Sequence, residues 1–282
     1  MTLNELYKNS SEKLHNIENG ATDARIIIKK VMSVTDTDFF IFGNCVVDDK
    51  HIKTVESMVQ ERLSGIPVQY IIGEWDFYGN TFTVNENVLV PRPETEILCE
   101  YVISCLKDKN NPVVADLCSG SGCIGITVKN EISSADVTMV EKSPEAASVC
   151  RENIVNILGE DQTKLIIGDI FYPEKLGISA SFDVIISNPP YIKSSEIPSL
   201  QPEVLLEPKM ALDGGEDGLD FYRLMAEKWT EYLADEGVFA FECGEEQADD
   251  IRFLLEEKGF DVHFVKDYSD IDRFVIGKRR KI

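Results

Sequence analysis

Apolar residues recur every three to four positions through the first 70 residues, a spacing typical of amphipathic helices. Thr2 and Glu5 match a capping box at the start of this region, and Gly65 with Pro67 indicates a stop at its end. The pattern predicts three helices, over residues 2–20, 23–34 and 49–63. Together they predict a small helical domain over residues 1–73.

Aromatic and β-branched residues replace the helical pattern from Glu74 onward. The stretch EWDFYGNTFTVNENVLV contains Gly79-Asn80, a pair that favours a tight turn between two strands. The sequence therefore predicts a β-hairpin over residues 74–90 that links two domains.

Residues 91–282 alternate short apolar runs with helical segments, after a first helix over 94–106. Seven of the runs are predicted strands: VVADL, DVTMVE, KLIIG, FDVIIS, GVFAFE, FDVHFV and RFVIG. This alternation predicts an α/β, Rossmann-like domain whose seven-stranded, mostly parallel sheet is covered on both faces. Ligands bind outside the carboxyl ends of such strands, so the residues just after Leu117, Val140, Ile167 and Ser187 form the candidate site.

The composition narrows the classes of function. A formal net charge of -22, from 50 acidic and 28 basic residues, disfavours a surface that tracks a phosphate backbone. No stretch approaches the ~20 apolar residues of a membrane span, and the first residues lack the basic end of a signal peptide. Seven cysteines without a CxxC pair and only three histidines indicate reduced thiols and no metal site. We expect a cytoplasmic protein without membrane contact.

A glycine loop follows the strand VVADL. It consists of Cys118, Ser119, Gly120, Ser121 and Gly122. Its glycines allow the backbone to come close to a ligand at a helix N-terminus. Residues 120–125 match GxGxxG, and Glu141 ends the next strand about twenty residues on, so a nicotinamide dinucleotide is one candidate ligand. A tight turn without any ligand is the other alternative.

Asp116 favours a different cofactor, because it lies at the end of the first strand where its carboxylate would repel a pyrophosphate. S-adenosylmethionine carries a sulfonium and an ammonium and no phosphate, so an acidic residue beside the loop suits it. Glu141 is then expected to accept hydrogen bonds from the ribose hydroxyls. Asp169 is expected to accept from the adenine amino group, with a loop or N-cap role as the alternative.

The strand FDVIIS ends in Asn188, Pro189, Pro190 and Tyr191. The two prolines fix φ and supply no N–H, which gives a rigid segment with outward carbonyls. An NH2 group needs two acceptors, and the Asn188 side-chain oxygen and the Pro189 carbonyl provide them, while Tyr191 offers a ring for stacking. A turn that only ends the strand is the alternative.

This arrangement addresses a chemical problem, because the nitrogen lone pair of an amide is delocalised and its oxygen is the better nucleophile. Two acceptors on the NH2 group select nitrogen and raise its electron density as it pyramidalises, so positioning and preorganised electrostatics dominate. The segment therefore predicts methylation of a planar amide or amino nitrogen.

Several spaced motifs resemble the PrmC/HemK family of release-factor glutamine methyltransferases. They are RLSGIPVQYIIGEWDFYG at 62–79, VLVPRPETE at 88–96, DLCSGSGCIG at 116–125, GDIF at 168–171, NPPYI at 188–192, EPKMALDGGEDGLDFYR at 207–223 and ECGEEQ at 242–247. The sequence departs from the family at Cys118, where the first glycine of the loop is usual, and at 270–272, which lacks a usual glycine.

The resemblance implies a class I S-adenosylmethionine-dependent methyltransferase domain over 91–282 and a substrate-recognition role for residues 1–73. It implies that residues 118–122, Glu141, Asp169 and Ile170 hold the cofactor, joined by Asp116 and Asn188. It further implies that residues 188–191 grip the glutamine, and that Arg92 and Glu94 border the same pocket.

The expected function is methylation of the Gly-Gly-Gln glutamine of peptide chain release factors on its side-chain amide nitrogen. We expect a monomer whose partners are release factors, with no stable nucleic-acid binding. The main alternative is a nucleic-acid amino methyltransferase acting on a flipped adenine or cytosine, which uses a similar proline-rich loop. A binding module that has the fold without turnover is a third reading.

Overall fold

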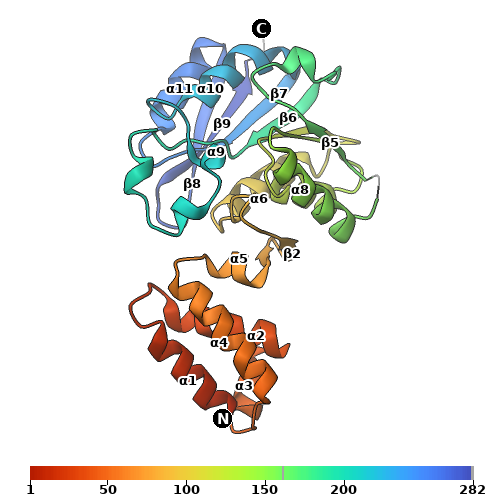
Figure 1. Cartoon of the computed structure of the whole chain (residues 1–282). Coiled ribbons are helices and arrows are strands. Elements are labelled where there is room, and N and C mark those ends of the chain that lie inside the picture. The colour runs from red at the N-terminus through yellow and green to blue at the C-terminus, as the bar shows by residue number, and fades with distance from the viewer. Residues whose placement is uncertain (161, 281–282) are drawn as a thin grey trace. The chain divides into compact units, whose positions relative to one another are not determined.

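The structure is a computed structural model that describes residues 1–160 and 162–280. The chain divides into two compact units (Figure 1). One comprises Met1–Glu74 together with Gln201–Leu206, and the other comprises Trp75–Leu200 together with Glu207–Ile282. No helix among the described residues is long and apolar enough to cross a bilayer.

The first unit is helical, with the bounds α1 Leu3–Lys13, α2 Gly20–Met32, α3 Asp36–Phe42, α4 Asp49–Leu63 and α5 Val68–Ile72. The capping box of Thr2 and Glu5 is present at the start of α1. The predicted first helix is too long, because α1 ends at Lys13 and Gly20 begins α2. A Cβ on Gly20 would lie 2.1 Å from the Leu14 carbonyl oxygen, so this glycine serves a close approach between segments and is no helix stop.

A buried arginine is the first residue of the motif at 62–79. Arg62 in α4 is 2% exposed, and its Nε donates to Asp23 Oδ2 of α2 at 2.7 Å. Its Nη2 also donates to Glu203, which belongs to the segment Gln201–Leu206. The Arg62–Glu203 ion pair therefore attaches residues 201–206 to the helical unit, although Glu203 lies 141 positions after Arg62 in the chain.

A hairpin of β1 Glu74–Phe77 and β2 Asn80–Thr83 belongs to the second unit from Trp75 onward, and residues 84–90 are not part of the hairpin. The main sheet of the second unit has the strand order β5-β4-β3-β6-β7-β9-β8. The strands are β3 Val113–Leu117, β4 Asp136–Glu141, β5 Lys164–Ile167, β6 Phe182–Ser187, β7 Leu233–Glu242, β8 Phe260–Lys266 and β9 Asp272–Arg279. β3 to β7 are parallel, and β9 is antiparallel to both β7 and β8. The seven-stranded, mostly parallel sheet is confirmed.

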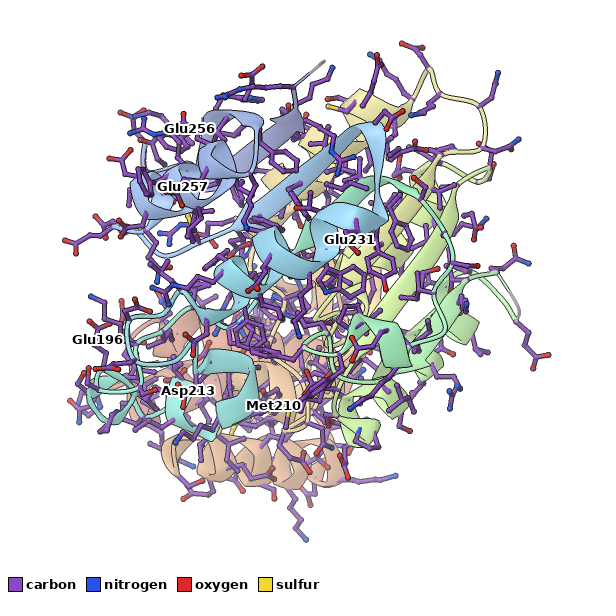
Figure 2. The ribbon with its side chains drawn as sticks, turned by 90° about the horizontal axis from the view of Figure 1, so that it is seen from above. Glu196, Met210, Asp213, Glu231, Glu256 and Glu257 are labelled. Atoms are coloured by element: carbon purple, nitrogen blue, oxygen red, sulfur yellow. The ribbon has the colours of Figure 1, made fainter. Side chains whose placement is uncertain are left out.

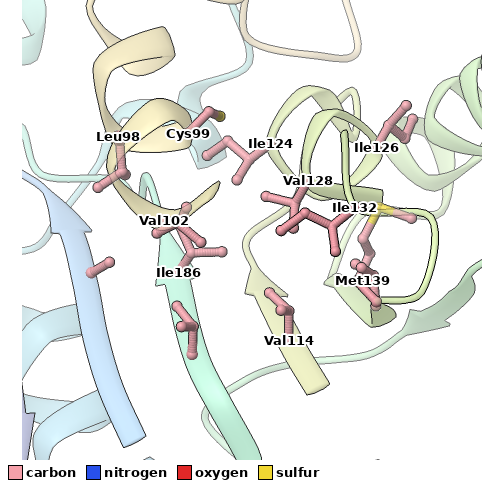
Figure 3. Close-up of a cluster of buried hydrophobic side chains, with 14 of the residues drawn as sticks. Leu98, Cys99, Val102, Val114, Ile124, Ile126, Val128, Ile132, Met139 and Ile186 are labelled. Carbon is pink, nitrogen blue, oxygen red and sulfur yellow. The ribbon is translucent and has the colours of Figure 1, made fainter. Parts of the chain in front are cut away.

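Helices cover both faces of this sheet (Figure 1). They are α6 Thr95–Leu106, α7 Cys123–Glu131, α8 Pro144–Ile157, α10 Asp220–Leu224 and α11 Ala248–Glu257. The short helix α9 Lys209–Leu212 belongs to neither core cluster. Because side chains alternate along a strand, Val114 and Ile186 pack with α6 and α7 on one face (Figure 3). Ala115 and Ile185 pack on the other face, with the cluster that contains Trp229.

Candidate functional site

A cavity of about 270 Å³ lies where the loops after β3, β4, β5 and β6 meet. This volume is close to the lower end of the range of ~300–1,000 Å³ for small-molecule sites. The predicted site residues that line it are Arg92, Cys118, Ser119, Gly120, Ser121, Glu141, Asp169, Ile170, Asn188 and Pro190. The carboxyl ends of the parallel strands thus gather these side chains, as expected for an open α/β sheet. Five predicted residues do not line it: Asp116, Gly122, Pro189, Tyr191 and Glu94.

The glycine loop carries three residues with left-handed backbone angles. Gly120 has φ +53° and Gly122 has φ +82°. Cys118 has φ +62°, a region that a residue with a Cβ rarely adopts. A Cβ on Gly120 would meet nothing within 4 Å, whereas one on Gly122 would lie 2.6 Å from Cys150 Sγ and 2.8 Å from Ile126 Cδ1. Gly120 therefore borders the ligand space, and Gly122 keeps the loop close to the core.

Asp116 lies beneath the loop and is fully buried. Its Oδ2 accepts from the Gly125 N–H at 2.9 Å, and no described donor reaches Oδ1. Burial raises the pKa of Asp116 to about 7, and the nearby Glu141 carboxylate adds to this shift. Asp116 does not line the cavity.

Glu141 lines the cavity and also fixes the loop. Its Oε2 accepts from Gly120 N at 2.9 Å, and its Oε1 accepts from Ser143 N at 2.8 Å. Each carboxylate oxygen has a second lone pair, so both oxygens still have acceptor capacity for a ligand hydroxyl.

Asp169 has the loop role considered from the sequence, and it also lines the cavity, where its expected role toward adenine stays a prediction. Its Oδ1 accepts from Phe171 N at 3.0 Å, which closes its own turn, and its Oδ2 lies 2.9 Å from Lys142 Nζ. Phe171 packs edge-on against Phe221 with ring centroids 5.3 Å apart, and both rings line the cavity. The cavity thus has an aromatic side next to a carboxylate.

Residues of the motifs at 207–223 and 242–247 contact the backbone of the proline segment 188–191 and the residue after it. The Tyr191 carbonyl accepts from Gln247 Nε2 at 2.9 Å, and Ile192 N donates to Leu212 O at 2.9 Å. A Cβ on Gly214 would lie 2.7 Å from the Tyr191 Cα. These contacts explain why residues 207–223 and 242–247 accompany NPPY in the sequence. Tyr191 is half-buried outside the cavity lining, and burial raises the pKa of its hydroxyl.

Asn188 makes a contact that the sequence reasoning missed. Its Nδ2 donates to Thr95 Oγ1 at 3.3 Å, and Thr95 Oγ1 donates to Glu242 Oε2 at 2.6 Å. Thr95 lines the cavity, whereas Glu242 does not. Thr95 lies in the motif at 88–96 and Glu242 in the motif at 242–247, so these motifs were the sequence signal for the contact.

Other lining residues were also missed. They include Phe171, Phe221, Pro208, Met210 and Ala211, together with residues 86–89 and Pro91. Met210 belongs to α9 and is labelled in Figure 2 beside Asp213. Most of these residues lie inside the quoted motifs, so the motifs indicated them without assigning a role.

The charges around the cavity suit S-adenosylmethionine. Two basic side chains line it and both are paired, Arg92 with Glu207 at 2.6 Å and Lys142 with Asp169. The described lining therefore offers no unpaired cation to a pyrophosphate, whereas the Glu141 carboxylate, which accepts from two backbone N–H groups, favours a positive ligand. No group of three His, Cys, Asp or Glu among the described residues is arranged to hold a metal ion.

Comparisons with known proteins agree along almost the whole chain. The family models "PrmC N-terminal domain" and "Methyltransferase small domain" match residues 5–73 and 94–216. The chain is 36% identical over 257 residues to the release factor glutamine methyltransferase of Aquifex aeolicus, covering 91% of this chain and 90% of that protein. It is 37% identical over 268 residues to that of Thermodesulfovibrio yellowstonii, covering 92% of each. A methyltransferase structure from Pyrococcus furiosus has a similar fold, with a TM-score of 0.53 and 16% identity, over 80% of this chain and 98% of that one.

Proposed function

Since the chain belongs to the family of release factor glutamine methyltransferases, we propose that it methylates the side-chain amide nitrogen of the Gly-Gly-Gln glutamine in peptide chain release factors. The methyl donor is S-adenosylmethionine, which supplies an electrophilic methyl group on a sulfonium when it is bound. The observation that carries the proposal is the position of Asn188, whose side chain borders an acidic cavity and gives its N–H to Thr95.

The nitrogen of the glutamine is selected by acceptors. With its Nδ2 engaged, Asn188 keeps Oδ1 as an acceptor for one hydrogen of the substrate NH2, and the Pro189 carbonyl accepts the other. These bonds strengthen as the nitrogen pyramidalises, so they stabilise the transition state more than the ground state. Pro190 and Tyr191 keep this segment rigid, and the Tyr191 ring stacks on the amide plane.

The cofactor-holding roles follow from the same cavity. Glu141 accepts from the ribose hydroxyls, Asp169 and Ile170 hold the adenine, and the loop 118–122 lies along the remainder of the cofactor. Phe171 adds an apolar surface for the adenine ring. The buried Asp116 lies beneath the loop, and a positive ligand above it would favour its ionised form.

Residues 1–73 recognise the intact release factor in this proposal. Support comes from the match of residues 5–73 to the PrmC N-terminal domain and from exposed apolar side chains on the helical unit. Phe40 is 91% exposed and Val46 is 80% exposed, which is unusual for large apolar side chains without a partner. The monomer acts in the cytoplasm, and its net charge of -22 disfavours stable nucleic-acid binding.

The test is incubation with labelled S-adenosylmethionine and an intact release factor, followed by mass spectrometry of the Gly-Gly-Gln peptide. One added methyl on the glutamine side chain is expected, and none on a factor whose acceptor glutamine is replaced. Methylation of the replaced factor, or of DNA under the same conditions, would contradict the proposal.

A further inference from the structure

Asn188 is the first member of a chain of three polar side chains. Its Nδ2 donates to Thr95 Oγ1 at 3.3 Å, and Thr95 Oγ1 donates to Glu242 Oε2 at 2.6 Å. Thr95 and Glu242 are each 2% exposed, so bulk water does not compete for these bonds. The chain thus connects the cavity to a carboxylate inside the protein.

The sheet register brings these residues together. β6 and β7 are parallel neighbours in which Ser187 pairs with Phe241, so Asn188 and Glu242 follow at the same level. Ile186 and Ala240, two positions earlier, share the cluster that α6 covers, and alternation directs the next pair to the same face. Thr95 is the first residue of α6 and lies over both of them.

The direction of the hydrogen bonds fixes the orientation of the Asn188 amide. A carboxylate only accepts, so the single Thr95 proton goes to Glu242. The Thr95 oxygen can then only accept, and Asn188 must present its NH2 group to it. The Asn188 Oδ1 is thereby left for the cavity, which is the orientation that an acceptor for a substrate NH2 requires.

We propose that Thr95 and Glu242 are positioning residues that hold the Asn188 amide with its oxygen toward the methyl acceptor. The inference rests on the proposed function, in which Asn188 Oδ1 accepts from the substrate nitrogen. Neither residue touches the reacting atoms. Their effect is to exclude the flipped amide, which would place two N–H donors opposite the substrate NH2 group.

Protonation of Glu242 removes this constraint. A carboxylic acid can donate to Thr95, Thr95 can then donate to Asn188 Oδ1, and the amide flips. Burial raises the pKa of Glu242 to about 7, opposed by the Thr95 hydrogen bond. The other charged or titratable groups that face Glu242 are Arg92, Glu94, Cys99, Cys123, Tyr191, Tyr222, Cys243 and Arg273. Turnover is therefore expected to fall as the pH drops through about 7.

The main experiment compares Thr95→Val with Thr95→Ser in steady-state methylation of an intact release factor. Valine has the shape of threonine without the hydroxyl, so kcat should fall about tenfold or more. The KM for the release factor and the calorimetric affinity for S-adenosylmethionine should change less than about twofold. Serine restores the hydroxyl and should recover most of the kcat. Thr127→Val is the matched control, because Thr127 is fully buried and its Oγ1 has no described partner.

Glu242→Gln supplies the second readout. Residue 242 cannot titrate in this variant, so its kcat should no longer fall as the pH drops through about 7. The kcat of the Thr127→Val control should still fall over the same pH range. A Thr95→Val enzyme with wild-type kcat and an unchanged pH profile would overturn the proposal. Equal losses in Thr95→Ser and Thr95→Val would also overturn it, since the hydroxyl would then be irrelevant.

A measurement without substrate separates this inference from the proposed function. The side-chain NH2 resonances of Asn188, assigned by their loss in Asn188→Ala, should shift between pH 6 and pH 8 in the wild type and stay fixed in Glu242→Gln. Asn188 resonances that do not respond to pH in the wild type would refute the positioning of Asn188 by Thr95 and Glu242, even if the release factor is methylated. A shift in an enzyme that methylates no release factor would instead refute the proposed function alone.

Discussion

The two glycines of the cofactor loop should respond differently to the same substitution, and this difference tests the account of the loop. Gly120→Ala and Gly122→Ala each place a Cβ on a residue with positive φ. Gly259→Ala is the matched control, because its φ is +85° and a Cβ there would meet nothing within 4 Å. The left-handed conformation costs an alanine about 1–2 kcal/mol at any of the three positions.

At Gly122 alone, a steric clash adds to the cost of the left-handed conformation. A Cβ on Gly122 would lie 2.6 Å from Cys150 Sγ and 2.8 Å from Ile126 Cδ1, inside the core. Overpacking of this kind costs about 1–3 kcal/mol. We expect Gly122→Ala to lose about 1–3 kcal/mol more free energy of unfolding than Gly259→Ala, and Gly120→Ala to lose no more than the control.

Cofactor affinity should show a different order. A Cβ on Gly120 would enter the space that the loop borders, so Gly120→Ala should weaken binding of S-adenosylmethionine about tenfold, which corresponds to about 1.4 kcal/mol. Gly259→Ala should bind as the wild type does. Urea unfolding followed by fluorescence of the buried Trp229 and calorimetric titration of the cofactor measure the two effects.

Two results would refute the reasoning. Equal unfolding free energies for Gly122→Ala and Gly259→Ala would mean that the core contact around Gly122 does not constrain the loop. A Gly120→Ala enzyme with wild-type affinity would mean that the cofactor does not approach the loop at this glycine.

Four further predictions concern the pocket, the buried carboxylate beneath its loop and the helical unit. Asn188→Ala should lower kcat on a release factor about a hundredfold with little change in cofactor affinity, and near-normal turnover would exclude its acceptor role. Tyr191→Phe should keep most activity and Tyr191→Ala should not, whereas equal losses in steady-state assays would point to the hydroxyl. The raised pKa of Asp116, about 7, means that the folded state retains a proton there that the unfolded state releases above its ordinary value of 3.8, so this group's contribution to stability is lost as the pH rises through about 7. Asp116→Asn should therefore raise the unfolding free energy at pH 8, and this gain should shrink as the pH falls from about 7 toward the ordinary value of 3.8. A gain that does not depend on pH in urea titrations would contradict it. Phe40→Asp with Ile41→Asp should lower activity on intact release factor without changing the Tm or cofactor affinity, and unchanged activity would remove this surface from recognition.

Local sequence patterns determined most of the secondary structure of the catalytic unit. β3, β4 and β6 have the predicted bounds, because each is a short apolar run closed by polar or turn residues. The helix α4 was also predicted with its bounds, since Asp48 caps its start and Gly65 follows its end. The same patterns failed around Gly20, where the need for glycine arises from Leu14 against it and not from a helix end.

The sequence by itself also determined which loops form the site, because strand order along the chain places Cys118, Glu141, Asp169 and Asn188 after parallel strands. Only the tertiary structure decided how these residues are held. Thr95 and Asn188 are 93 positions apart, and Thr95 and Glu242 are 147 apart, so no local pattern could pair them. The pairing follows from the register of β6 with β7 and from α6 packing across their ends, and these long-range contacts are fixed only when the whole core closes.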